Sequence, residues 1–153
     1  MTHPLISALA ERYGLPSVDE TSIDAFLAPA AGEPAHALLF FTGDPEQRAE
    51  TLDVAVVLPE ILAAFQRRLR GAVVTRAAET ALAPRFRVMV HPSLVVTRDG
   101  APIAVMPKIR DWSEYLERIE AALAPDAPVM ASEERPRVAF TTSGGAARAG
   151  GAA

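Results

Sequence analysis

Apolar residues occur along the chain in two spacings, one typical of strands and one typical of helices. Residues His36–Phe41, HALLFF, form an almost continuous apolar run between turn-forming segments, which is typical of a strand buried on both faces. Further on, apolar residues recur three and four positions apart, as on one face of a helix. These are Val54, Val57, Leu58, Ile61, Leu62, Phe65 and Leu69. The pattern therefore predicts a central strand followed by an amphipathic helix.

Shorter segments on either side predict a parallel sheet. Helical spacing marks residues 4–13, a short strand is expected at 17–19, and a short helix follows around 23–27. After the amphipathic helix, the run GAVVT at 71–75 predicts a strand and the alanine-rich segment 77–86 a helix. Strands that alternate with helices are typical of parallel strands joined by right-handed crossovers.

From Val88 onward the pattern changes to an antiparallel hairpin. Two β-rich runs are separated by Asp99 and Gly100, and Asp-Gly between such runs is a strong hairpin signal. Pro107 indicates that the second run is an edge strand or that it ends there. Asp111 and Glu114 then predict the capped start of a helix. Its expected apolar face consists of Trp112, Tyr115, Leu116, Ile119 and Leu123.

Length and composition predict one domain with a tail. A chain of 153 residues, half of them apolar, is long enough for a single core. We place the domain at residues 1–123, including the extra helix at 4–13. Residues 124–153 are rich in Ala, Gly and Pro and are expected to form a mobile tail, because they bury too little apolar surface to offset the entropy of ordering.

Several classes of function are disfavoured by composition. The net charge of −4 and the scattered basic residues argue against nucleic-acid binding. No signal peptide or long apolar stretch is evident, so a cytoplasmic protein without membrane insertion is expected. The chain has no cysteine, and its three histidines are far apart, so we expect no thiol chemistry, metal site or cofactor. We therefore expect a protein that is not an enzyme.

Acidic residues gather where the amphipathic helix begins. Asp44, Glu46, Glu50, Asp53 and Glu60 are accompanied there only by Arg48, so residues 44–60 carry a charge of about −4. One interpretation is a patch that binds a basic peptide. The alternative is that these carboxylates are merely solvated, because acidic residues near the start of a helix are favoured by the helix dipole alone.

The order of elements and one proline motif resemble thioredoxin between residues 17 and 123. Pro59 lies inside the predicted helix, and Val90-His91-Pro92-Ser93 is similar to the thioredoxin segment whose proline is cis. The resemblance implies a thioredoxin-like α/β fold. It has three parallel strands, then an antiparallel hairpin, with helices on both faces of the mixed sheet. It also implies a cis bond before Pro92 and places His91 and Pro92 at the site. The redox cysteine positions fall on Thr51 and Val54.

Separated motifs identify a closer family. GDPEQRAETLDVAVVLPEI, HPSLVVTRDG and IRDWSEYLERI resemble the HupG/HyaE/HoxO family of hydrogenase accessory proteins. The resemblance implies a non-redox chaperone in the maturation of uptake [NiFe] hydrogenases. It would bind the small-subunit precursor with its twin-arginine signal peptide, and possible further partners are other hydrogenase accessory proteins. The alternative is a structural scaffold subunit of a maturation complex that does not bind the signal peptide.

Overall fold

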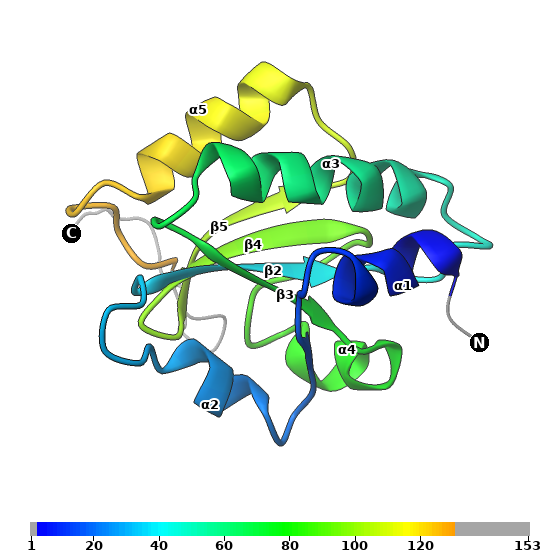
Figure 1. Cartoon of the computed structure of the whole chain (residues 1–153), viewed down its shortest axis with the longest axis horizontal. Coiled ribbons are helices and arrows are strands. Elements are labelled where there is room, and N and C mark those ends of the chain that lie inside the picture. Colours follow the sequence, from blue (N-terminus) through cyan, green and yellow to red (C-terminus); the bar gives the residue numbers. More distant parts are fainter. Residues whose placement is uncertain (1–2, 131–153) are drawn as a thin grey trace, which may run out of the picture.

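The computed structural model describes residues 3–130 and is built on a five-stranded mixed sheet (Figure 1). The strand order is β1-β3-β2-β4-β5. The strands are β1 (Ser17–Val18), β2 (His36–Phe41), β3 (Arg70–Val74), β4 (Ser93–Arg98) and β5 (Ala101–Pro107). The first three are parallel, while β4 and β5 form an antiparallel hairpin. This confirms the predicted sheet, with β2 at its centre and β5 at one edge.

Helices cover both faces of the sheet, as predicted (Figure 1). Those on one face are α1 (Pro4–Glu11), α3 (Glu50–Ala64) and α5 (Trp112–Ala122). Those on the other are α2 (Ile23–Leu27) and α4 (Arg76–Leu82). A hydrophobic core lies on each face of the sheet. Alternate residues of β2 pack into one core or the other, because successive side chains of a strand point to opposite faces. Phe40 packs beneath α3 and Phe41 packs beside α4.

The hairpin has the chemistry that its sequence predicts. Asp99 and Gly100 both have positive φ angles, 51° and 85°, as a two-residue turn of the type that matches strand twist requires. The turn pairs β5 with β4, and β4 in turn lies against β2, where Phe40 is opposite Leu94. As a result, the segment that precedes β4 reaches the same end of the sheet at which α3 begins.

Helix α3 begins at Glu50 and continues through Pro59 to Ala64. Its buried residues are Thr51, Val54, Ala55, Leu58 and Ile61. Asp44 and Glu46 therefore lie in the turn before the helix. No helix among residues 3–130 is long and apolar enough to cross a bilayer.

Two expectations near the carboxyl end are corrected. Trp112 does not join the core, because it occupies the first position of α5, one turn before the buried Tyr115, and it is 44% exposed. The packed domain also extends beyond residue 123. Ala127 is buried, and the N–H of Met130 donates to the carbonyl of Pro102. The predicted mobile tail otherwise lies outside the described residues.

Candidate functional site

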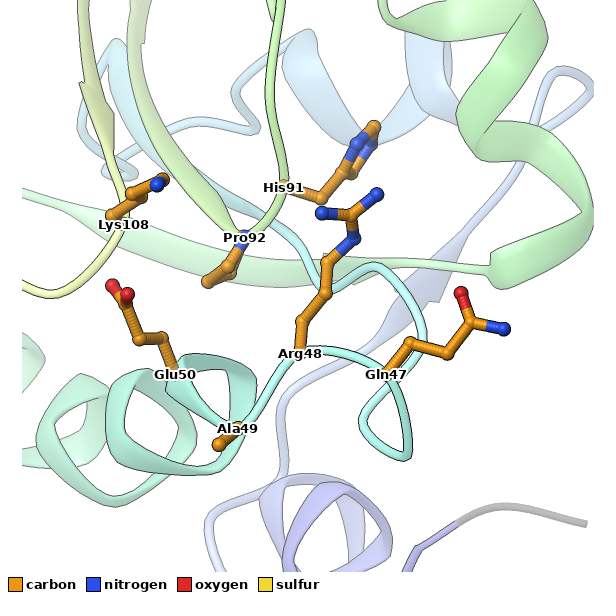
Figure 2. A pocket seen from close by; sticks show the side chains of 7 residues that line it. All are labelled: Gln47, Arg48, Ala49, Glu50, His91, Pro92 and Lys108. Atoms are coloured by element: carbon orange, nitrogen blue, oxygen red, sulfur yellow. The ribbon is translucent and has the colours of Figure 1, made fainter.

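The peptide bond between His91 and Pro92 is cis, as predicted, and it faces the amino end of α3. A pocket of about 260 Å³ lies between these two parts of the chain. It is lined by Gln47, Arg48, Ala49, Glu50, His91, Pro92 and Lys108 (Figure 2). The lining thus comes from the turn before α3, the start of α3, the segment before β4 and the residue after β5.

Two helices hold the segment that places Lys108 at the pocket. The Glu50 carboxylate at the start of α3 accepts a hydrogen bond from the N–H of Ile109, 2.9 Å away. From α5, the Tyr115 hydroxyl accepts from the N–H of Arg110 at 3.1 Å and donates to the Lys108 carbonyl at 3.3 Å. Burial raises the pKa of Tyr115, because a low-polarity environment disfavours the phenolate. The segment is therefore anchored on both sides.

Buried polar residues connect the end of β2 to α3 and α4. The hydroxyl of Thr51 donates to the carbonyl of Thr42 at 2.5 Å. Glu79 of α4 is 6% exposed, and its Oε2 accepts from the N–H of Thr42 and the N–H of Gly43 at 2.8 and 3.0 Å. Glu79 thus satisfies two backbone donors, and Thr51 satisfies one backbone acceptor, that would otherwise be buried without a partner.

His91 lies directly against this network. Its Nε2 is 3.9 Å from Oε1 of Glu79 and has no hydrogen-bond partner in the described structure. The guanidinium of Arg76 is 3.5 Å from the same carboxylate oxygen. Gly43, with φ of 70°, passes so close that an added Cβ would lie 2.7 Å from the Cβ of His91. Only glycine fits this backbone conformation and this approach without strain.

The five predicted carboxylates do not form one uniform patch. Glu50 lies in the pocket and is bonded to Ile109, while Asp44 is 3.8 Å from the Arg76 guanidinium. Glu46, Asp53 and Glu60 are exposed. The expected charge of about −4 is therefore not concentrated in one patch, because Glu50 and Asp44 interact with residues that are distant in the sequence. Of the predicted site residues, the pocket joins Glu50, His91 and Pro92.

Arg48 and Lys108 are the principal residues that sequence reasoning missed. In the sequence Arg48 offsets one charge of the acidic residues, and no motif links it to Lys108. Both are exposed and line the pocket. The signal that could have pointed to Lys108 is the register of the hairpin, because Pro107 lies opposite Ser93 at the end next to Pro92.

Apolar side chains are exposed next to the pocket. Met89 and Val90, which precede His91, are 79% and 40% exposed. On α3, Val56 is 60% exposed and shares a helical face with Asp53 and Glu60, which lie three positions before it and four after it. Large apolar residues exposed beside charged ones are typical of surfaces that bind another chain.

The described residues offer no metal site, because no group of three or more His, Asp or Glu side chains among residues 3–130 could hold an ion. The chain has no cysteine. Thr51 and Val54, at the positions implied for redox cysteines, are both buried. The arrangement offers groups that bind, with apolar surface and charges of both signs, and no recognisable nucleophile.

Comparisons with known proteins agree with one another. A family model described as Hydrogenase-1 expression protein HyaE matches residues 5–115. The hydrogenase expression/formation protein HupG of Rhizobium leguminosarum bv. viciae is 62% identical over 144 residues, which is 94% of this chain and 97% of that protein. HoxO of Azotobacter vinelandii is 38% identical over 90% of this chain and 86% of its own. A crystal structure described as hydrogenase expression/formation protein hupG from Rhodopseudomonas palustris is 45% identical, covers 71% of this chain and 95% of its own, and gives a TM-score of 0.51.

Proposed function

The chain belongs to the HyaE family of hydrogenase expression proteins, and from that premise we propose that it serves hydrogenase maturation as a non-catalytic, cytoplasmic chaperone. Its partner is the small-subunit precursor of an uptake [NiFe] hydrogenase, which it binds through the twin-arginine signal peptide. The relatives are hydrogenase expression/formation proteins, which supports the maturation role.

The observation that carries the proposal is the exposed apolar surface beside the pocket. A twin-arginine signal peptide joins an arginine pair to an apolar segment, so its receptor needs both apolar contacts and carboxylates. Met89 and Val90 offer the first beside Pro92. The exposed carboxylates Glu46, Asp53 and Glu60 offer the second, and arginine forms strong two-point contacts with carboxylates.

A catalytic role is disfavoured by the chemistry of the same region. Thiol exchange requires a thiolate, and the chain has no cysteine. The buried carboxylate of Glu79 is occupied by its structural hydrogen bonds from Thr42 and Gly43. A role in binding uses the exposed groups that remain.

A scaffold subunit is the second candidate. Such a protein would assemble with other accessory proteins of the maturation pathway and would not contact the signal peptide. The exposed Trp112 on α5 and Leu5 on α1, 44% and 40% exposed, favour this candidate, because neither residue lines the pocket and both offer apolar surface to another protein.

The test is a binding measurement with three forms of the small-subunit precursor: intact, without its signal peptide, and with the arginine pair replaced by lysines. Each is measured at low and at physiological salt. We expect the intact form to bind most tightly and the lysine form more weakly, because arginine makes two-point contacts with carboxylates. Binding of the intact form should weaken at the higher salt concentration, because exposed charges are screened. Equal binding with and without the signal peptide would instead favour the scaffold.

A further inference from the structure

Two cationic side chains face the pocket without any carboxylate partner. Arg48 extends from the turn before α3 toward His91, and Lys108 points into the pocket from the opposite side (Figure 2). Within residues 3–130 neither makes an ion pair or a side-chain hydrogen bond, whereas Arg76 nearby lies 3.8 Å from Asp44. Arg48 and Lys108 therefore bring positive charge to the pocket that its one carboxylate, Glu50, offsets only in part.

The described residues that line the pocket include two cationic side chains and one carboxylate. That carboxylate belongs to Glu50, and its Oε1 accepts a hydrogen bond from the N–H of Ile109. Helix α3 begins beside the pocket, and the acidic residues of its first turn, Glu50 and Asp53, lie at the positive end of its dipole.

We infer that this pocket receives the carboxylate of an aspartate or glutamate side chain from the bound hydrogenase precursor, held between Arg48 and Lys108. The inference rests on the proposed function and adds the chemical identity of one contact. A volume of about 260 Å³ suits one side chain better than a cofactor-sized ligand. The exposed apolar residues Met89 and Val90 lie beside the pocket, where they contact the chain that carries the acidic residue.

This contact orients the bound segment. Its acidic residue occupies the pocket, and its basic residues lie over the exposed carboxylates of α3, Asp53 and Glu60. A segment bound in the reverse direction would place like charges together at both ends, which is costly at an interface. Charge at the site therefore selects direction as well as partner.

The protein side is tested with the double variant Arg48→Gln and Lys108→Gln in the full chain. Its matched control is Arg12→Gln and Arg67→Gln, which removes the same charge from two exposed residues, Arg12 after α1 and Arg67 beyond the far end of α3. We expect the pocket variant to bind the intact precursor about tenfold more weakly and the control less than about twofold more weakly, because only the first removes a close charge contact.

The partner side is tested by replacing each aspartate and glutamate of the precursor with its amide, one at a time. One replacement should weaken binding to the parent protein and have little further effect on the pocket variant, since a double-mutant cycle reports such coupling. If no acidic residue couples to Arg48 and Lys108, or if both double variants bind alike, the inference is overturned.

A titration with sodium acetate separates the pocket from the partner. Saturable shifts of the backbone amide signals of Glu50 and Ile109, absent in the pocket variant, are expected in the isolated protein. Saturation by acetate without a coupled acidic residue in the precursor would assign the pocket to a free anion and overturn the partner contact. If the parent protein does not bind the precursor at all, the proposed function and the partner contact are both overturned. The acetate titration then reports only whether the pocket binds an anion.

Discussion

Glu79 and Thr42 are joined by two hydrogen bonds in which one carboxylate oxygen accepts both the backbone N–H, at 2.8 Å, and the side-chain hydroxyl, at 3.0 Å. The same oxygen accepts the N–H of Gly43 at 3.0 Å. These hydrogen bonds connect α4 to the segment that follows β2. The other oxygen of the same carboxylate lies 3.9 Å from the Nε2 of His91. A buried carboxylate therefore fixes the backbone on which the site is built.

The first prediction is that Glu79→Ala lowers the free energy of unfolding by about 2–4 kcal/mol, because it leaves two buried N–H groups without an acceptor. Glu79→Gln should lose less, since one acceptor oxygen remains. Urea denaturation measures both. The control is Thr80→Ala at the next, exposed position, and an equal loss in all three variants would contradict the assigned role of Glu79.

The fold was largely predictable because its signals are local. The apolar run of β2 and the Asp99-Gly100 turn each specify an element within a few residues. The parallel half followed from the alternation of strands and helices. Trp112 was misplaced because helical spacing predicts which positions share a face but not where the sheet beneath the helix ends.

The site was only partly predictable because it depends on contacts between distant segments. The resemblance to thioredoxin placed His91 and Pro92 correctly beside the start of α3. It could not show that the N–H of Ile109 would bond to Glu50, or that Lys108 would arrive opposite Arg48. Both depend on contacts between segments that are distant in the sequence, and only the register of the β4–β5 hairpin points toward the position of Lys108.

The second prediction concerns Tyr115, which the structure shows anchoring Lys108 and Arg110. Burial raises its pKa, so the folded state holds the phenol proton more tightly than the unfolded chain does. This contribution to stability is complete below the ordinary tyrosine pKa of about 10 and is lost as the pH rises through the folded value.

An ultraviolet titration of the folded protein checks the prediction. The chain has two tyrosines, so Tyr115→Phe should remove the titration step that occurs at the higher pH, and Tyr13→Phe should retain it. Tyr115→Phe should also cost about 1 kcal/mol in urea denaturation through its lost hydrogen bonds. A late step that survives in Tyr115→Phe would show that the phenol is not protected.

The third prediction is that the protein does not reduce disulfides. The attacking group in thiol exchange is a thiolate, and Thr51 and Val54 occupy the positions implied for cysteines. Insulin reduction should proceed no faster with the protein than with a boiled sample, whereas a thioredoxin assayed in parallel turns over. Turnover above the boiled sample would show a chemistry that the residues do not suggest.

The fourth prediction tests the exposed carboxylates without disturbing the pocket. Reversal of Glu46, Asp53 and Glu60 to lysine should slow association with the precursor about tenfold at low salt, with a smaller effect at high salt, because exposed charges act mainly on the rate of encounter. Glu50 is left unchanged, since its bond to Ile109 is structural.

The control for this reversal carries the same change in net charge on other exposed surfaces. Glu20, Glu117 and Asp126, all exposed, are changed together to lysine. Stopped-flow association is measured after circular dichroism has shown that both variants fold. Equal rates for the two variants would mean that only net charge matters and that the three carboxylates are a solvated face.

The last prediction uses Gly43, whose backbone lies against His91. Gly43→Ala must adopt a positive φ and place its Cβ 2.7 Å from the Cβ of His91, while Gly32→Ala faces the same conformational cost, at φ of 87°, with nothing within 4 Å. Left-handed geometry alone costs a side chain about 1–2 kcal/mol. Gly43→Ala should lose about 1–3 kcal/mol more, because the loop before Pro92 has to move to make room.

Urea denaturation measures the difference, and amide shifts of residues 89–93 should change in Gly43→Ala but not in Gly32→Ala. The precursor should bind Gly43→Ala more weakly than the parent protein and Gly32→Ala as tightly, because displacement of His91 distorts the pocket. Equal losses of stability and equal binding by the two variants would mean that the loop moves without cost and does not shape the site.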